Sequence, residues 1–193
     1  MTRLEATQLL VAALGHEPIV SSLGHPTYDL FAAGDRPSNF YTWGSMGLAS
    51  SIGLGLALAR PDLRVFVVDG DGSVLMNLGS LATIGWTSPP NLVLLVWDNE
   101  KHGTTGGQDT ATAHGADLAA AARALGIQSA VCARTGDELS SAVARTRVER
   151  GPWVIVAKVT ESGTSARPPL DNVAIKKRFM SAIGNPEAGN DRR

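Results

Sequence analysis

Short apolar runs alternate along the chain with segments of helical spacing. The runs lie at 18–23, 64–69, 91–97, 129–133 and 152–159. Runs that are apolar at consecutive positions are typical of strands buried on both faces of a parallel sheet. The helical segments lie at 2–14, 28–33, 48–59, 74–86, 117–125, 137–150 and 172–183. This alternation predicts an α/β protein: an open parallel sheet with helices on both faces.

Three local patterns refine this picture. Segment 48–59 is almost entirely small or apolar, which predicts a buried helix, and its Gly53 and Gly55 would allow close packing. Each glycine costs a helix about 1 kcal/mol relative to alanine. Segment 101–112 is polar and glycine-rich, which predicts a loop. Cys132, the only cysteine, lies in an apolar run; it predicts a small buried residue and excludes an internal disulfide.

Length and composition indicate one soluble domain over residues 1–193, with 162–193 as a C-terminal linker, helix and tail. The net charge is −1 and there is no basic block, so nucleic acid is not expected as a partner. No window of 18 uncharged apolar residues occurs, and residues 1–14 lack the pattern of a signal peptide. We therefore expect a cytoplasmic protein without a membrane partner.

Candidate chemistry begins where the apolar run 64–69 ends, at Gly70-Asp71-Gly72-Ser73. A strand that ends in glycines and leads into a helix N-terminus suits a phosphate group. The next apolar run ends in Asp98-Asn99, so Asp71 and Asn99 would offer oxygen atoms to Mg²⁺ at the same edge of the sheet. The spacing alone is equally compatible with two ordinary turns at strand ends.

A third motif, Gly44-Ser45-Met46-Gly47, makes a family resemblance usable. Together the three motifs resemble the cofactor motifs of thiamine diphosphate (ThDP) enzymes, in which G-D-G is followed by N-N. Asp98 stands where that pattern has its first Asn. Longer stretches resemble the decarboxylases of sulfopyruvate and phosphonopyruvate, and they lie at 35–41, 44–58, 70–84, 103–108 and, more weakly, 176–180.

The resemblance implies roles for the residues that bind ThDP and Mg²⁺. The side chains of Asp71 and Asn99 and the carbonyl of Lys101 would bind Mg²⁺. Backbone amides in the diphosphate-binding segments would hold the diphosphate, and these segments contain Gly70, Gly72, Ser73, Gly103 and Thr104.

In the third motif, the carbonyl of Gly44 would accept from the cofactor's 4′-amino group, and Ser45 belongs to the same cofactor-binding loop. The Met46 amide would contact the pyrimidine ring, and its side chain would wedge between the two rings of the cofactor. The alternative for Met46 is ordinary core packing.

Two histidines are candidate catalytic residues. His102 follows Asn99 by three residues, where the resembled families place Tyr or His near the cofactor. His25 follows the first apolar run and would lie at the same edge of the sheet. The alternative for each is a solvated loop histidine.

One group that the resemblance requires is missing from the motifs. ThDP enzymes need a glutamate beside N1′ of the pyrimidine, supplied by a separate pyrimidine-binding domain, and only 43 residues precede Gly44. The expectation is a β subunit that shares its active site with an α subunit in an α₂β₂ or larger heteromer. Such an enzyme would convert a 2-oxo acid, sulfopyruvate or phosphonopyruvate, into an aldehyde and CO₂.

Two other functions stay open. The first is half of a ThDP-dependent carboligase, which the Glu100-Lys101-His102 stretch keeps open because it departs from the resembled sulfopyruvate enzymes. The second is a non-catalytic subunit that binds ThDP or supports a partner, although the intact motif residues Asp71, Asn99, Gly44 and Met46 argue against it. A general P-loop nucleotide site is disfavoured because the Lys-Ser/Thr of that motif is absent.

Overall fold

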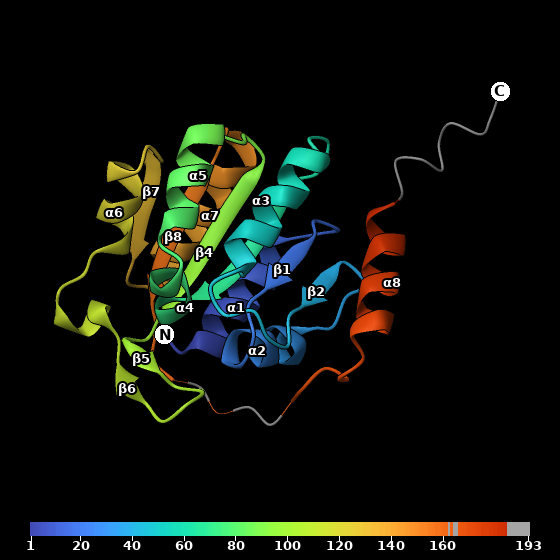
Figure 1. The fold of residues 1–193 in the computed structure, drawn as a ribbon, viewed down its shortest axis with the longest axis horizontal. Coiled ribbons are helices and arrows are strands. Elements are labelled where there is room, and N and C mark those ends of the chain that lie inside the picture. The colour runs from blue at the N-terminus through green and yellow to red at the C-terminus, as the bar shows by residue number, and fades with distance from the viewer. Residues whose placement is uncertain (162, 164–165, 185–193) are drawn as a thin grey trace.

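Six parallel strands form one sheet at the centre of the molecule (Figure 1). The structure is a computed structural model, and it describes residues 1–161, 163 and 166–184. The strand order is β2-β1-β3-β4-β8-β7, and every neighbouring pair is parallel. The strands are β1 (Ile19–Ser21), β2 (Asn39–Tyr41), β3 (Val65–Gly70), β4 (Leu92–Asp98), β7 (Ser129–Ala133) and β8 (Trp153–Lys158). The predicted open parallel sheet is confirmed.

Helices cover both faces of this sheet, as predicted (Figure 1). One face carries α1 (Arg3–Ala13), α2 (His25–Ala33) and α7 (Gly136–Val148). The other carries α3 (Ala49–Ala59), α4 (Asp71–Met76), α5 (Gly79–Thr87) and α6 (Leu118–Ala124). The final helix, α8 (Asn172–Ile183), packs beside the edge strand β2.

The central strands bury side chains on both faces, which explains their continuous apolar sequence. In β3, Phe66 and Val68 enter one core cluster while Val65 and Val67 enter the other. Strand β4 is buried along its whole length. The strand ends are thereby held rigidly, so that the polar residues following β3 and β4 have fixed positions.

Helix α3 is only half buried, in contrast to the prediction for 48–59. Gly53 faces the sheet, where a Cβ would lie 2.1 Å from Cγ2 of Val67, so its close packing is confirmed. A Cβ on Gly55 would meet nothing within 4 Å, so this glycine faces away from the sheet. The helix also exposes Ile52 and Leu58, because it forms the outer layer of the molecule.

The predicted single helix over 74–86 is wrong. The chain forms α4 and α5, which are separated at Asn77 and Leu78. Asn77 leaves helical geometry with φ −133° and ψ 51°, and its side-chain amide donates to the Gly47 carbonyl at 2.9 Å. A contact with a distant segment therefore accompanies the break.

Two smaller predictions also need correction. Segment 101–112 contains an antiparallel hairpin, β5 (Lys101–His102) and β6 (Gln108–Asp109), followed by a 3₁₀ helix, η1 (Ala111–His114). Cys132 is exposed because it lies on β7, an outer strand of the sheet.

No helix among the described residues is long and apolar enough to cross a membrane. Parts of the predicted linker after 162, and the tail after Gly184, lie outside the described residues.

Candidate functional site

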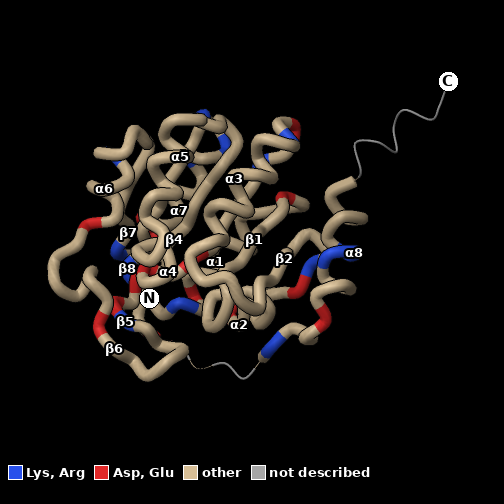
Figure 2. Tube along the Cα trace, viewed as in Figure 1, with Lys and Arg blue, Asp and Glu red and all other residues tan. Residues whose placement is uncertain are grey.

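A cavity of about 580 Å³ lies beyond the carboxyl ends of β1, β3 and β4. This is the edge at which open parallel sheets bind ligands. Its wall contains all of the predicted site residues except Gly44 and Ser45, which are exposed outside it. Basic and acidic residues lie near one another around this edge (Figure 2). The sheet topology thus brings together residues that are up to 108 positions apart in the chain, from Arg3 to Ala111.

The predicted phosphate-binding turn forms one wall of the cavity. Strand β3 ends at Gly70, α4 begins at Asp71, and no side chain caps the N-terminus of that helix. The first amides of a helix point beyond its N-terminus and favour an anion. A Cβ on Gly72 would lie 2.5 Å from Cε1 of His102, so the imidazole rests directly on this glycine. A side chain at position 72 would collide with His102.

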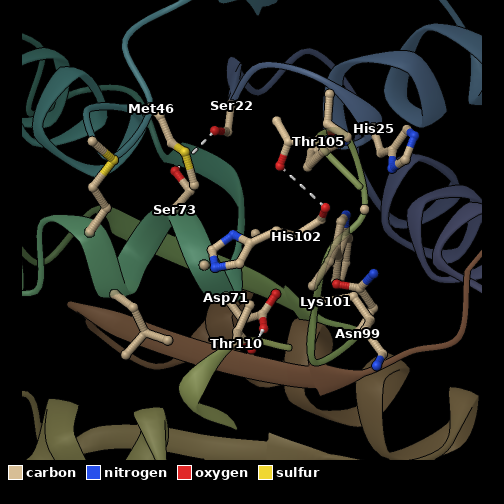
Figure 3. Close-up of a pocket in the computed structure, with 18 of the residues that line it drawn as sticks. Ser22, His25, Met46, Asp71, Ser73, Asn99, Lys101, His102, Thr105 and Thr110 are labelled. Atoms are coloured by element: carbon tan, nitrogen blue, oxygen red, sulfur yellow. Dashed lines mark hydrogen bonds between the residues drawn. The ribbon is translucent and has the colours of Figure 1, made fainter. Parts of the chain in front are cut away.

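His102 therefore lies beside the predicted phosphate-binding turn. Figure 3 shows its ring between Asp71 and Ser73. His25 lies in the opposite wall, at the start of α2, where a Cβ on Gly103 would be 3.1 Å from its Nδ1. Burial lowers the pKa of His25, and the positive charge of Arg3 lowers it further. The lowered pKa favours the neutral imidazole of His25 near pH 7.

Behind the turn, Asp69 is fully buried on β3. Its Oδ1 accepts a hydrogen bond from the Gly70 amide at 2.9 Å. Burial raises the pKa of Asp69 to about 6, although the nearby hydroxyl groups of Ser73 and Ser22 and the Gly70 amide act in the opposite direction. This carboxyl group holds the first residue of the turn from inside the protein.

Three oxygen-bearing groups meet beside the turn: the carboxylate of Asp71, the amide of Asn99 and the carbonyl of Lys101. One end of the Asn99 amide lies 3.3 Å from Oδ1 of Asp71 and 3.1 Å from the Lys101 oxygen. With its nitrogen there, Asn99 donates to both oxygens. With its oxygen there, the spacing matches the roughly 3 Å between neighbouring ligands of an octahedral cation with bonds of about 2.1 Å. The donor set therefore fits a hard divalent cation.

The residue between Asn99 and Lys101 has an unusual backbone conformation. Glu100 has a φ of 63°, in the left-handed region that non-glycine residues seldom adopt. Such conformations cost about 1–3 kcal/mol and concentrate at functional sites. No group of three or more His, Cys, Asp or Glu residues that could hold a metal occurs in the part of the chain that the structure describes. A cation here would depend on the amide and the carbonyl as well as on Asp71.

The second oxygen of Asp71 is occupied by two hydroxyl groups. Oδ2 accepts from Oγ1 of Thr110, and from Oγ1 of Thr112 at 3.0 Å. Burial raises the pKa of Asp71 and the nearby charge of Asp98 adds to this effect, while the two threonine hydrogen bonds oppose it. The hydroxyls leave only Oδ1 facing Asn99. Sequence reasoning missed Thr112 because no local motif connects it with Asp71.

The Met46 loop is fastened through both backbone groups of Gly47, to Ser73 in α4 and to Asn77, which directly follows α4. The Gly47 amide donates to Oγ of Ser73 at 2.9 Å, and the Gly47 carbonyl accepts from Nδ2 of Asn77 at 2.9 Å. Gly47 has a φ of +83°, and a Cβ there would lie 3.0 Å from that of Asn77. These contacts place Met46 in the cavity wall, 37% exposed. Ser45, beside it, also has a positive φ of 62°.

The comparison with known families decides what this edge of the sheet is. Residues 27–157 match the family described as "Thiamine pyrophosphate enzyme, C-terminal TPP binding domain". The chain belongs to this thiamine pyrophosphate (ThDP) enzyme family. The family resemblance predicted from the three motifs is confirmed, and so is a ThDP-binding domain. The roles of individual residues stay predictions.

Named relatives match this ThDP-family chain over most of its length. Sulfopyruvate decarboxylase subunit beta of Methanococcus maripaludis is 44% identical over 191 residues, 95% of this chain and 98% of the relative. Phosphonopyruvate decarboxylase of Streptomyces viridochromogenes is 40% identical over 191 residues, 97% of this chain but only 48% of the relative. The ThDP-dependent 4-hydroxybenzoylformate decarboxylase of Rhodococcus jostii RHA1 shares the fold, with a TM-score of 0.70 and 18% identity over 85% of this chain and 33% of that protein.

Proposed function

We propose that the chain is the β subunit of a ThDP- and Mg²⁺-dependent 2-oxo acid decarboxylase. Its substrate is sulfopyruvate or phosphonopyruvate, and the products are the aldehyde and CO₂. The observation that carries this proposal is the meeting of Asp71, Asn99 and the Lys101 carbonyl beside the N-terminus of α4. The relatives named as sulfopyruvate and phosphonopyruvate decarboxylases support the reaction and the substrate class.

The residues that meet beside the turn would bind the metal ion and the diphosphate. Asp71, Asn99 and the Lys101 carbonyl would hold Mg²⁺ against the diphosphate, and the amides of Gly72 and Ser73 would bind the diphosphate oxygens. Bound ThDP supplies the electron sink that decarboxylation of a 2-oxo acid requires.

The remaining tasks are positioning and proton handling. The Met46 side chain, fixed through Gly47, would set the orientation of the cofactor rings. Neutral His25 can accept or donate a proton at the opposite wall. His102 lies on the diphosphate-binding turn, which suits contact with the diphosphate end of the cofactor more directly than contact with the substrate.

The proposal includes a partner chain. Among the described residues, no glutamate lines the cavity, so the carboxylate that activates the pyrimidine ring would come from an α subunit. This chain spans about half of the phosphonopyruvate decarboxylase but nearly all of the sulfopyruvate decarboxylase subunit beta. Exposed apolar side chains continue from the cavity onto the neighbouring helices, at Met46, Leu48, Ile52 and Met76. We expect an α₂β₂ or larger assembly in which these side chains are covered.

Substitution of Asp71 tests the site. In the complex reconstituted from both subunits, Asp71→Ala should abolish Mg²⁺-dependent ThDP binding, measured by calorimetric titration with and without EDTA. Removal of one ligand carboxylate leaves two neutral donors for a dication, and neutral donors hold Mg²⁺ poorly.

Asp62→Ala is the matched control, because Asp62 is an exposed carboxylate paired with Arg60. It should bind ThDP like the unaltered chain. Unchanged ThDP affinity in Asp71→Ala would refute the site assignment. Acyloin products in place of aldehyde would support the carboligase instead of the decarboxylase.

A further inference from the structure

A second layer of charged and hydroxyl groups lies directly behind the candidate cation site. Asp98 ends β4 and Lys158 ends β8, and the two residues are partners in the parallel register of these strands. Oδ2 of Asp98 lies 2.8 Å from Nζ of Lys158. Asp98 is 2% exposed, so its carboxylate is removed from water and needs a counter-charge inside the protein.

Thr112 connects this ion pair to Asp71. Its Oγ1 lies 2.8 Å from Oδ1 of Asp98 and 3.0 Å from Oδ2 of Asp71. The remaining bond to Asp98 comes from the Glu100 amide at 3.2 Å. Oδ1 of Asp98 thus accepts from the Glu100 amide and Oδ2 pairs with Lys158, while the single hydroxyl proton of Thr112 lies between two carboxylates and can be donated to only one of them at a time. Such an arrangement is favourable only if the charge of one carboxylate is balanced nearby.

The charges at this edge form a matched pair. Asp98 stands where the ThDP motif has an uncharged asparagine, which adds one negative charge beside Asn99. Lys158 adds one positive charge on the adjacent strand. Lys158 also lies 2.7 Å from Oε1 of Glu100, but that carboxylate is 45% exposed, and exposed pairs contribute little.

We propose that Lys158 is a positioning residue for the cation site that the proposed function requires. Its ammonium balances Asp98, so that Thr112 stays between the two carboxylates and holds Oδ2 of Asp71. Only Oδ1 is then presented to the cation, together with Asn99 and the Lys101 carbonyl. The ThDP motif has one uncharged asparagine at the position of Asp98. In this chain the ion pair of Asp98 and Lys158, which has no net charge, takes its place.

A double-mutant cycle tests this pairing. Mn²⁺ would be titrated into the full chain with saturating ThDP, and free Mn²⁺ would be followed by electron paramagnetic resonance. Asp98→Asn should weaken Mn²⁺ binding about tenfold, because it leaves the ammonium of Lys158 unbalanced beside a dication. When Lys158→Met is added to Asp98→Asn, the Mn²⁺ affinity should return to within about threefold of that of the unaltered chain, because the two side chains together carry no net charge again.

In the natural background, the same Lys158→Met change should weaken binding, because Asp98 and Asp71 then repel one another across Thr112. A long-range charge effect alone would strengthen Mn²⁺ binding in both backgrounds when the lysine is removed. Strengthening in both backgrounds, or an equal effect in both, would overturn the proposal. If Lys158→Met does not fold, Lys158→Gln, which also removes the charge, takes its place in the natural background, where the two explanations predict opposite changes in Mn²⁺ affinity.

Two controls separate the possible failures. Lys177→Met on α8 removes the same charge from an exposed position and should leave Mn²⁺ affinity unchanged. Asp71→Ala in the same titration tests the cation site itself. If Asp71→Ala binds Mn²⁺ normally, both the proposed site and this inference fail. If Asp71→Ala loses binding but Lys158→Met has the same effect in both backgrounds, only the positioning role fails.

Discussion

At the scale of single residues, Asp71 divides its two oxygens between two tasks. Oδ2 accepts hydrogen bonds from Thr110 and Thr112, while Oδ1 faces the Asn99 amide. Hydrogen bonds that fix a ligand carboxylate are the usual means by which a protein tunes a metal site. The motif G-D-G predicts Asp71, but nothing in its neighbourhood indicates which hydroxyl groups will reach it from 39 and 41 residues away.

His25 should make the stability of the chain depend on pH. Burial, followed by the charge of Arg3, lowers its pKa in the folded state. Below the ordinary histidine pKa of about 6.5 the unfolded chain binds the proton more readily, so stability should fall as the pH drops below that value towards the lowered pKa.

The measurement is the melting temperature of the unaltered chain and of His25→Gln between pH 5 and pH 8. The variant should lose much of the decline on the acid side and match the unaltered chain at pH 8. Parallel pH profiles would contradict this role of His25. His16→Gln, at an exposed position, is the control.

At the scale of elements, the contacts between segments decide what the sequence pattern leaves open. The apolar runs predicted the central strands well, because a strand buried on both faces has a local signature. The break between α4 and α5 has none, because it accompanies the bond from Asn77 to Gly47, 30 residues away. The proposed role of Lys158 has no local signature either, because it depends on the register between β4 and β8.

Asn77→Ala should loosen the Met46 loop. It removes the hydrogen bond to the Gly47 carbonyl, which is worth about 1 kcal/mol and corresponds to roughly a fivefold change in affinity if it is realised only with the loop in place. ThDP affinity of the reconstituted complex is the measurement.

Asn172→Ala, at the exposed start of α8, is the control and should bind ThDP normally. If Asn77→Ala also binds ThDP with unchanged affinity, α4 does not fasten the loop in the way described.

Two glycines of α3 should respond in opposite directions. Gly53→Ala forces a methyl group to within 2.1 Å of a Val67 carbon and should destabilise the fold by about 1–3 kcal/mol. Gly55→Ala meets no atom within 4 Å and should stabilise the helix by up to about 1 kcal/mol. Urea denaturation of both variants measures this difference. Equal effects would show that the packing of α3 on the sheet is not as described.

At the scale of the whole molecule, one cavity contains most of the groups that the proposed function requires. The sheet edge collects the diphosphate-binding turn, the oxygen donors and the Met46 loop in one cavity, yet no glutamate among the described residues lines it. The sequence predicts a shared active site, because the cofactor motifs are local while the activating group is missing from them, and this stays a prediction. It does not identify the partner, since exposed apolar side chains indicate contact without specifying what covers them.

The release of CO₂ from a 2-oxo acid tests the central claim most directly. It would be measured with 3-sulfopyruvate and 3-phosphonopyruvate, at saturating ThDP and Mg²⁺, for this chain alone and after mixing with the proposed pyrimidine-domain subunit. We expect background rates for the chain alone, rapid decarboxylation of at least one substrate by the mixture, and background rates when the mixture contains Asp71→Ala. Rapid decarboxylation by the chain alone would contradict the shared active site.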